Sequence, residues 1–414
     1  MSDHKIINDP VFGFIKVPHG LLLNIIKHPI FQRLNRIKQL GLANVVYPGA
    51  QHTRFQHSIG AFHLMSEAII SLRQKGHFIF DSEAEAVEAA ILMHDIGHGP
   101  FSHVLENTLI SGVDHEEISL MLMERMNDDF NGALTLAINI FRDNYHKRFL
   151  HQLISSQLDM DRLDYIRRDS FFTGVTEGNI GSARIIKMLN VVDDHLVVEK
   201  KGIYSIENFL VTRRLMYWQV YLHKTTVACE KMLVNVLRRA KHLAHEGKEL
   251  FCSPALHYFL YNNINKQQFE SDDKCLENYI KLDDNDIWCA LKVWTESDDI
   301  VLRILSRNIM ERRIFKVEVS SSEVSPERIA KVKEAIAKKY SIDTETADYF
   351  ISVNTVGKNM YSTLDDSIEI LFSDGTTCDV SEASDMLNVQ TLSRTVCKYY
   401  FCYERDAYTE PAKE

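Results

Sequence analysis

Apolar residues recur at helical spacing through most of the first 250 residues. The segment 20–40 carries apolar side chains three and four positions apart, and Pro29 is expected to divide it into two helices because proline lacks the N–H donor of a helix interior. Residues 55–75 and 82–98 repeat this spacing, and a long helix is predicted over 205–244, which contains neither glycine nor proline. The first 250 residues are therefore predicted to form a helical core.

The sequence marks both ends of the helix predicted near residue 82. Ser82 with Glu85 three positions later predicts a capping box, and the alanine-rich segment that follows favours a helix. Gly97, Gly99 and Pro100 are expected to end or bend it. The adjacent histidine and aspartate of "HDIGH" fall at this end. If the helix ends there, the two side chains need not point the same way, and the glycines let the backbone turn around an ion.

The pattern changes after about residue 310. Four segments with alternating and β-branched residues predict strands: "RRIFKVEVS", "DYFISVNTV", "SIEILFSDG" and "CKYYFCYE". A helix after the first of them is predicted to have Ser325 as its cap and Pro326 at its first position. The fold class is therefore predicted to be mainly α, with a helical core over 1–250, a helical bridging region over 251–310 and a small α+β domain over 311–414. A structural, oligomerisation or regulatory role is expected for this last domain.

Composition narrows the expected location and partners. The net charge of −10 argues against nucleic acid as the main partner, although a local basic groove is compatible with it. The seven cysteines form no CxxC pair, which favours a reducing compartment. No apolar run approaches the roughly 18 residues that a membrane span needs, and "MSDHKIINDP" lacks a signal-peptide pattern. We therefore expect a cytoplasmic protein.

Histidines and carboxylates gather in a way that suggests a metal site. Eight of the 18 histidines lie between His52 and His115; they include His57 in "TRFQHS" and His94, next to Asp95, in "HDIGH". A later run contributes Asp159, Asp161, Asp164 and Asp169. A single histidine is more often structural, and the aspartates alone suggest a solvated helix face with Asp–Arg pairs. Together, imidazoles and carboxylates suit a divalent ion that keeps positions open for water and phosphate.

Longer strings around these residues carry a family resemblance. "FQRLNRIKQLG", "YPGAQHTRFQHSIG", "HDIGHGPFSH" and "DMDRLDYIRRDS" resemble the sterile-alpha-motif and HD-domain dNTP triphosphohydrolases and their bacterial relatives, over roughly residues 8–240. The resemblance implies an HD-domain helical core and hydrolysis of a dNTP to deoxynucleoside and inorganic triphosphate. It also implies a divalent metal ion (Mg, Mn, Fe, Zn or Ni), whose ligands would be His57, His94, Asp95 and Asp161.

The same resemblance implies roles for further residues. Histidines near the scissile phosphate would be His98, His103 and His115; His103 is the first choice as general acid, and His115, paired with Glu116 or Asp114, is the alternative. The phosphate ligands would be Arg54, Arg162 and Arg213, and the residues around the sugar and base would be Gln39, Tyr165, Asp169 and Tyr221. Arginines suit this role because a triphosphate carries about four negative charges. Tyr165 below the sugar would exclude a 2′-hydroxyl.

Regulation and alternative functions follow from the same comparison. The resemblance implies a homo-oligomer and a possible activating nucleotide, but Asn35 replaces a basic residue that holds the guanine nucleotide in the animal enzyme, which argues against that form of activation. One alternative is an HD-type hydrolase of another phosphate ester, such as a nucleoside monophosphate, a cyclic dinucleotide or (p)ppGpp. Another is a nucleotide-sensing or nucleic-acid-binding protein with a relic site. The complete set of metal ligands argues against a relic.

Overall fold

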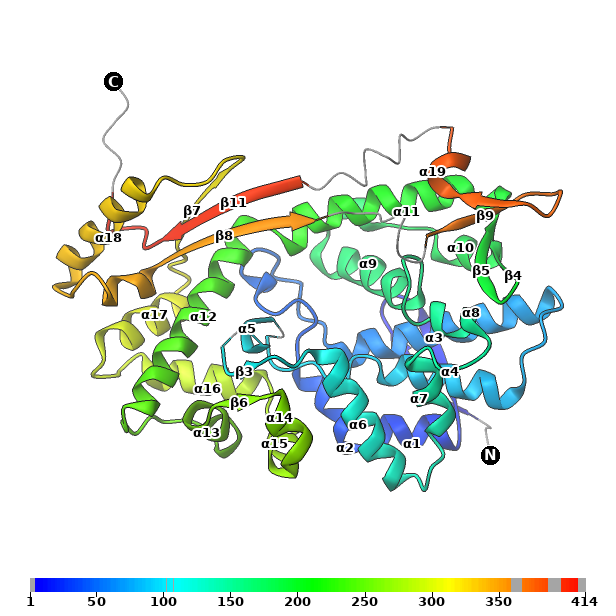
Figure 1. Cartoon of the computed structure of the whole chain (residues 1–414), viewed down its shortest axis with the longest axis horizontal. Helices are drawn as coiled ribbons and strands as arrows, with labels where there is room; N and C mark the ends of the chain where they lie inside the picture. The colour runs from blue at the N-terminus through cyan, green and yellow to red at the C-terminus, as the bar shows by residue number, and fades with distance from the viewer. Residues whose placement is uncertain (1–3, 102, 107, 359–366, 386–395, 409–414) are drawn as a thin grey trace.

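Three packed helices form the centre of the fold, and they carry the segments that contain the metal candidates. The computed structural model describes residues 4–101, 103–106, 108–358, 367–385 and 396–408. Helix α3 (Arg54–Gln74) packs against both α4 (Asp81–Met93) and α9 (Met160–Thr173) (Figure 1). The predicted mainly α fold class is confirmed.

Further helices surround this centre. Those of the N-terminal part are α1 (Leu21–Lys27), α2 (Pro29–Gln32), α5 (His103–Glu106), α6 (His115–Asp129), α7 (Thr135–Phe141), α8 (Arg148–Gln152), α10 (Ser182–Met188), α11 (Ile203–Met216) and α12 (Lys224–His245). They are followed by α13 (Pro254–Tyr261), α14 (Lys266–Ser271), α15 (Asp273–Tyr279), α16 (Asp284–Trp294), α17 (Ile300–Met310), α18 (Pro326–Tyr340) and α19 (Val380–Ala383). Among the described residues, none of the helices combines the length and the apolar character that crossing a bilayer requires.

Helix α3 is buried on most of its faces, because α4, α9 and α10 all pack on it. Large apolar side chains such as Phe62 and Leu72 face the core, and small residues such as Gly60 and Ala61 allow neighbouring helices to approach. The buried apolar residues of the described chain join in one core cluster, which includes α12, α16 and α17 from the later part of the chain. Burial of this helix therefore fixes the position of its first turn, where His57 lies.

Two predicted helix boundaries are confirmed. His28 separates α1 from α2, and Pro29 is the first residue of α2. The division at Pro29 was predicted because proline lacks an N–H donor. Ser325 caps α18 by accepting the N–H of Arg328, and Pro326 occupies the first helical position. Local sequence rules succeed at these two boundaries because the capping groups lie within three residues of the helix that they begin.

The capping box predicted at Ser82 and Glu85 is wrong. Helix α4 begins at Asp81, and it is the carboxylate of Glu83 that accepts the backbone N–H of Phe80, at 2.8 Å. Glu83 also accepts hydrogen bonds from Tyr145 and Lys147, which lie far along the chain. These distant donors hold Glu83 at the helix start, and the N-cap lies two residues earlier than predicted, at Phe80 instead of Ser82.

The long helix predicted over 205–244 is interrupted. Helix α11 ends at Met216, a π-helical turn follows over Tyr217–Tyr221, and α12 begins at Lys224. The Tyr47 hydroxyl donates to the carbonyl of Gln219 in this turn, and the Tyr400 hydroxyl donates to the carbonyl of Leu222 just after it. These two hydroxyls come from distant parts of the chain, so the break is accompanied by tertiary contacts that the local sequence does not show.

Four small sheets complete the fold within the described residues. Three strands, β7 (Lys316–Ser320), β11 (Val396–Tyr403) and β8 (Ile351–Lys358), form an antiparallel sheet in that order, and β3 (Ile110–Ser111) pairs with β6 (Ile264–Asn265). The order of another sheet is β10 (Thr377–Asp379), β9 (Glu369–Leu371), β5 (His195–Glu199) and β4 (Leu189–Val192). Strands are thus present in all four segments predicted to form them. The parallel pair β5–β9 joins the core to the C-terminal part, while the three-part division at 250 and 310 stays a prediction.

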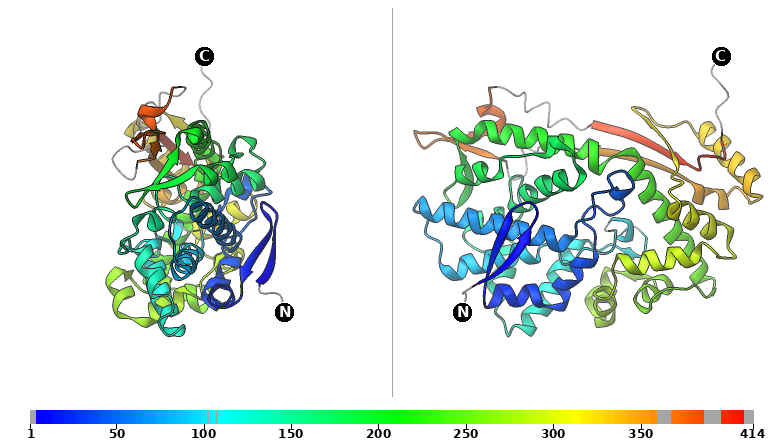
Figure 2. Two further views of the ribbon diagram at one scale, coloured as in Figure 1. Left: turned by 90° about the vertical axis from the view of Figure 1, so that its right-hand side faces the viewer. Right: turned by 180° about the vertical axis from the view of Figure 1, so that it is seen from behind.

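An N-terminal hairpin, which the sequence pattern did not predict, lies against the helical core. Strands β1 (His4–Asp9) and β2 (Gly13–Pro18) pair from His4 with Pro18 to Asp9 with Gly13. Figure 2 shows this hairpin, in dark blue, along one side of the molecule. Ile15 and Val17 are fully buried and attach the hairpin to the core. The turn therefore holds Asp9 at a fixed place against the helices.

We predict that Gly60→Ala destabilises the protein strongly. A Cβ atom at this position would lie 2.0 Å from Arg168 Nη2 and 2.0 Å from Asp164 Oδ1, both of which are buried. We expect the free energy of unfolding, measured by urea denaturation, to fall by about 3 kcal/mol. Gly181→Ala is the matched control, because its Cβ would meet only Arg184 Cβ at 3.9 Å. Equal stability of the two variants would contradict the packing described for α3 and α9.

Candidate metal centre

Three helix termini bring the candidate ligands into one place. His57 lies in the first turn of α3, and His94 directly follows the last residue of α4. Asp161 lies in the first turn of α9, after Asp159, which caps that helix by accepting the N–H of Arg162 at 2.7 Å. Because side chains at helix ends project past the packed helix bodies, they can meet in one small volume.

The distances between these ligand atoms are short. The Nε2 atom of His57 lies 3.2 Å from His94 Nε2 and 3.0 Å from Asp161 Oδ1, and His94 Nε2 lies 3.4 Å from the same Asp161 oxygen. Asp95 lies at the edge of this group, with Oδ2 3.7 Å from His57 Nε2 and Oδ1 3.4 Å from His94 Nε2. The structure therefore brings together all four residues predicted as metal ligands.

The hydrogen bonds behind the two imidazoles select their tautomers. His57 Nδ1 lies 2.7 Å from Asp164 Oδ2, and His94 Nδ1 lies 2.6 Å from the carbonyl oxygen of Ile91. Since both oxygens are acceptors, Nδ1 carries a proton in each ring, and each Nε2 faces the other and Asp161. Two ring nitrogens and a carboxylate oxygen at these distances need a positive charge between them, which a proton or a metal ion can supply. This donor set fits a divalent metal ion.

The pKa values reflect the concentration of charge. Burial alone would lower the pKa of His57, but hydrogen bonds to Asp161 and Asp164 outweigh burial and raise the pKa to about 10. Burial would raise the pKa of Asp161, and the two histidines overcome this and hold it well below its usual range. In the absence of a metal ion, a proton on His57 therefore balances the carboxylates.

His98 has the opposite character. Burial, together with the positive charge of Arg54, lowers the pKa of His98 to about 3, so its imidazole is neutral at physiological pH. Its Nε2 lies 3.2 Å from Asp95 Oδ1, and its ring stacks on that of His115 at 3.9 Å between centroids. Its buried Nδ1 has no hydrogen-bond partner within the described chain. These contacts favour His98 as a ligand-binding group.

Three arginines and an amide lie among the residues predicted to bind substrate. Arg54 Nη1 binds Asp95 Oδ2 at 2.5 Å, and Arg162 forms an ion pair with Asp159. Within the part of the chain that the structure describes, the buried polar atoms that lack a partner include Gln39 Oε1, Arg162 Nε, Arg213 Nε and Arg213 Nη1. Buried N–H groups without an acceptor are costly, and an anionic ligand would supply the acceptors.

Aromatic rings enclose the far side of the site. The ring of Tyr165 lies 6.4 Å from that of His57 and 6.0 Å from that of Tyr221. The Tyr221 hydroxyl donates to Asp169 Oδ2 at 2.7 Å, and His52 Nε2 lies 2.7 Å from Asp169 Oδ1. Asp169 is therefore held from both sides by protein groups and in turn fixes Tyr221.

One predicted catalytic residue, His103, is only partly placed, whereas His115 and Glu116 are described in full. His103 begins α5, but its side chain lies outside the described residues. His115 begins α6, while Glu116 is exposed. Asp114 pairs with Glu117 in the cap of α6, at 2.8 Å from Oδ1 to the Glu117 N–H.

Residues far along the chain hold the loop that follows His94, and the sequence pattern did not indicate them. The Tyr279 hydroxyl donates to the carbonyl of Gly97 at 2.6 Å. Asp284 accepts the backbone N–H of Lys38 at 2.9 Å and that of Phe101 at 3.3 Å. Gly97 itself is required, since a Cβ there would lie 2.1 Å from the carbonyl oxygen of His115. No local signal could have identified Tyr279 or Asp284, because each acts more than 180 residues away.

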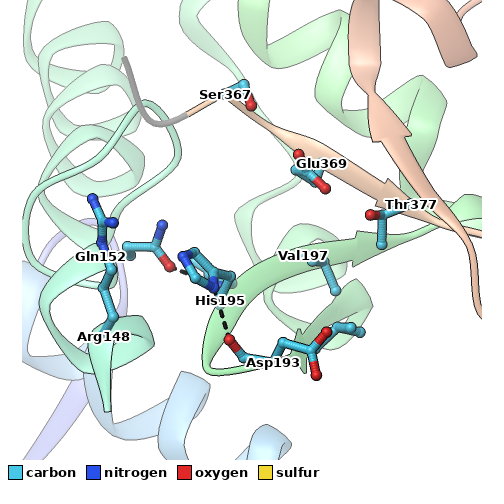
Figure 3. Close-up of a pocket in the computed structure, with 10 residues that line it drawn as sticks. Arg148, Gln152, Asp193, His195, Val197, Ser367, Glu369 and Thr377 are labelled. Carbon is cyan, nitrogen blue, oxygen red and sulfur yellow. Dashed lines mark hydrogen bonds between the residues drawn. The ribbon is translucent and has the colours of Figure 1, made fainter. Parts of the chain in front are cut away.

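The cavity drawn in Figure 3 lies elsewhere. It has a volume of about 430 Å³ and is lined by α8, the β4–β5 hairpin, β9 and β10, including Arg148, Gln152, His195, Glu369 and Thr377. His195 Nδ1 is bound to the carbonyl oxygen of Asp193 in the hairpin turn. None of the candidate metal ligands lines this cavity, so it is separate from the metal centre.

Comparison with known proteins agrees with this geometry. The family profile described as "HD domain" matches residues 54–169, and that described as "HD associated region" matches residues 180–251. The chain is 32% identical over 334 residues to the uncharacterized protein YwfO of Bacillus subtilis, covering 78% of this chain and 74% of that protein. It is 29% identical over 360 residues to the human deoxynucleoside triphosphate triphosphohydrolase SAMHD1, covering 75% of this chain and 54% of that enzyme. The chain thus spans about half the length of the human enzyme.

Two solved structures are similar to this chain. A crystal structure of a phosphohydrolase from Bacteroides thetaiotaomicron has a TM-score of 0.95 and 66% sequence identity, covering 97% of this chain and 100% of that one. A hypothetical protein from Aquifex aeolicus has a TM-score of 0.72 and 27% identity, covering 97% of this chain and 96% of that one.

We predict that metal binding releases a proton. Because the raised pKa of His57 keeps it protonated at neutral pH without metal, a metal ion must displace that proton. Apparent affinity for Mn²⁺ should therefore rise between about pH 6 and pH 8, and calorimetry in buffers of different ionisation enthalpy should show proton release. His195→Gln, on an exposed hairpin, is the control and should behave as the parent protein. Binding that is independent of pH would contradict the site.

Proposed function

This chain belongs to the HD-domain phosphohydrolase family, and we propose that it hydrolyses deoxynucleoside triphosphates to deoxynucleoside and inorganic triphosphate. The observation that carries the proposal is a His–His–Asp group that fits a divalent metal, with the buried Arg54 bound to Asp95 beside it and Arg162 directly after Asp161. The similarity to SAMHD1 enzymes, which are named deoxynucleoside triphosphate triphosphohydrolases, supports the choice of substrate.

The charges of the site suit a triphosphate. A triphosphate carries about four negative charges, and its burial requires several cations with geometrically defined donors. Arg54, Arg162 and Arg213 supply guanidinium groups, and the unpartnered N–H groups of Arg162 and Arg213 are the donors that phosphate oxygens would satisfy. A divalent metal ion bound by His57, His94, Asp95 and Asp161 would supply Lewis-acid polarisation of a phosphoryl oxygen and acidify water.

The reaction breaks the bond between the α-phosphorus and the 5′-oxygen, and water supplies the new oxygen on phosphorus. The departing 5′-oxygen needs a proton, for which His103 is our first choice and His115, beside Glu116, the second. The neutral His98, stacked on His115, contributes a hydrogen bond without adding positive charge. Arg54 holds Asp95 and keeps that carboxylate ionised at the edge of the site.

The sugar and the base would lie against the tyrosines. Tyr165 is held between the rings of His57 and Tyr221, and the Tyr221 hydroxyl is fixed by Asp169. A rigid phenol ring under the sugar would leave no space for a 2′-hydroxyl, which is a steric basis for selecting deoxynucleotides. The buried Oε1 of Gln39 lacks a partner in the described chain and would accept a hydrogen bond from the 3′-hydroxyl.

Assembly and regulation stay predictions. The family resemblance of the sequence implies a homo-oligomer and a possible activating nucleotide, and the composition predicts a cytoplasmic location. Light scattering would measure the oligomer, and assays with and without added GTP or a second dNTP would detect activation. The replacement of a basic residue by Asn35 argues against a guanine nucleotide held as in the animal enzyme.

We predict that the purified protein releases inorganic triphosphate from at least one dNTP in the presence of Mg²⁺, Mn²⁺ or Fe²⁺, and that Asp161→Ala lowers kcat by at least about 1,000-fold. Asp161 is the carboxylate that both imidazoles face, so its loss removes a ligand. Asp129→Ala, an exposed aspartate at the end of α6, is the control and should retain full activity. Release of phosphate from (p)ppGpp or a monophosphate, with none from any dNTP, would favour the alternative HD-type reaction.

We predict that kcat/KM for dGTP exceeds that for GTP, and that Tyr165→Ala reduces this ratio by about tenfold or more because the ring no longer occupies the space of the 2′-hydroxyl. Tyr165→Phe keeps the ring and should keep the ratio. If the parent protein hydrolyses GTP and dGTP equally well, the steric role of Tyr165 is wrong.

A further inference from the structure

A buried chain of alternating charges connects the N-terminal hairpin to His57. Asp9 Oδ2 lies 2.7 Å from Arg168 Nη1, and the other side of this guanidinium binds Asp164 through two bonds of 2.9 Å, Nε to Oδ2 and Nη2 to Oδ1. Asp164 Oδ2 then accepts the Nδ1 proton of His57 at 2.7 Å. Each link is a charged or charge-assisted hydrogen bond of good geometry.

The surroundings of this chain leave its members little freedom. The side chains of His57, Asp164 and Arg168 are fully buried, and that of Asp9 is 3% exposed. Gly60 makes the room for the Arg168–Asp164 pair, since any side chain at that position would overlap with both groups. Asp9 is itself fixed, because its Oδ1 accepts the backbone N–H groups of Val11 and Phe12 in the hairpin turn.

We propose that Asp9 and Arg168 are positioning residues of the metal centre, which act through Asp164 to hold the Nδ1 proton and the ring orientation of His57. With Nδ1 protonated, Nε2 presents its lone pair to the metal, and the negative charge of Asp164 makes that lone pair a stronger ligand. Arg168 fixes both oxygens of Asp164, and Asp9 fixes Arg168. The N-terminal hairpin, which supplies no metal ligand, thereby sets the metal affinity.

A purely structural role would have different consequences. If the Asp9–Arg168–Asp164 chain only attached the hairpin and α9 to the core, its loss would lower stability and leave the metal affinity of the folded protein unchanged. A positioning role changes metal affinity and the His57 tautomer in protein that is still folded. The proposal rests on the metal assignment and is independent of which phosphate ester is the substrate.

The test measures metal binding without nucleotide. The variants Asp164→Asn, Arg168→Lys and Asp9→Asn are titrated with Mn²⁺, followed by the electron paramagnetic resonance signal of the free ion, and their thermal unfolding is recorded. Asp164→Asn should bind Mn²⁺ about 10- to 100-fold more weakly, and Arg168→Lys and Asp9→Asn should weaken binding several-fold in the same direction.

Asp299→Asn is the matched control. Asp299 pairs with Arg239 at 2.5 Å and accepts the N–H of Leu302, so it combines an arginine and a backbone donor as Asp9 does, but outside the metal centre. Its substitution should lower the unfolding temperature and leave Mn²⁺ affinity unchanged. Because no nucleotide is present, a failure of dNTP hydrolysis and a failure of this proposal are distinguishable.

A second measurement keeps the proposal testable if Asp164→Asn does not fold. Two-bond ¹H–¹⁵N spectra of ¹⁵N-histidine-labelled, Zn²⁺-loaded protein report which ring nitrogen of His57 is protonated. We expect one His57 species in the parent, with Zn²⁺ on Nε2 and the proton on Nδ1, and additional His57 species, metal-free or bound through Nδ1, in Asp9→Asn and Arg168→Lys. Parent-like metal affinity together with an unchanged tautomer in these two variants would overturn the proposal.

Discussion

Two imidazole nitrogens, His57 Nε2 and His94 Nε2, meet 3.2 Å apart inside this protein, with Asp161 Oδ1 beside both. An isolated arrangement of this kind would be unfavourable, because lone pairs and a carboxylate repel one another in a medium of low dielectric constant. The fold maintains it by fixing the other nitrogen of each ring, through Asp164 and the Ile91 carbonyl. The site is thus organised for a cation before one binds.

Helix α9 shows how one short element serves several parts of the site. Asp161, Asp164 and Arg168 lie three and four positions apart, so they share one face of the helix and turn it toward α3. Asp161 lies next to His57 Nε2, at the metal position. Asp164 binds the other ring nitrogen, Nδ1, and is itself bound by Arg168. This division explains why the aspartate run is buried instead of solvated. Considered without its neighbours in space, the run had suggested a surface helix with Asp–Arg pairs.

How much the sequence could predict depends on the range of the interaction. The first residues of α2 and α18 were predictable because proline and a capping serine act on adjacent residues. The proximity of the four residues predicted as metal ligands could be predicted because "HDIGH" and its companion strings resemble a known family. The π-helical turn after Met216 was not predictable, since the Tyr47 and Tyr400 hydroxyls that bind carbonyls in and just after it come from distant parts of the chain. His52 and Tyr279 were missed for the same reason: their roles exist only in the folded arrangement.

The bridging region takes part in building the site. Tyr279 binds the carbonyl of Gly97, and Arg33, which donates to the carbonyls of Ile96 and Leu282, lies with its guanidinium 4.8 Å from the Tyr279 ring centroid. Asp284 accepts the backbone N–H groups of Lys38, which precedes Gln39, and of Phe101, and so links these two segments. The loop after His94 lacks regular hydrogen bonding of its own, so it depends on these groups to stay in place. A helical core ending near residue 250 would therefore leave the metal loop without the side chains that position it.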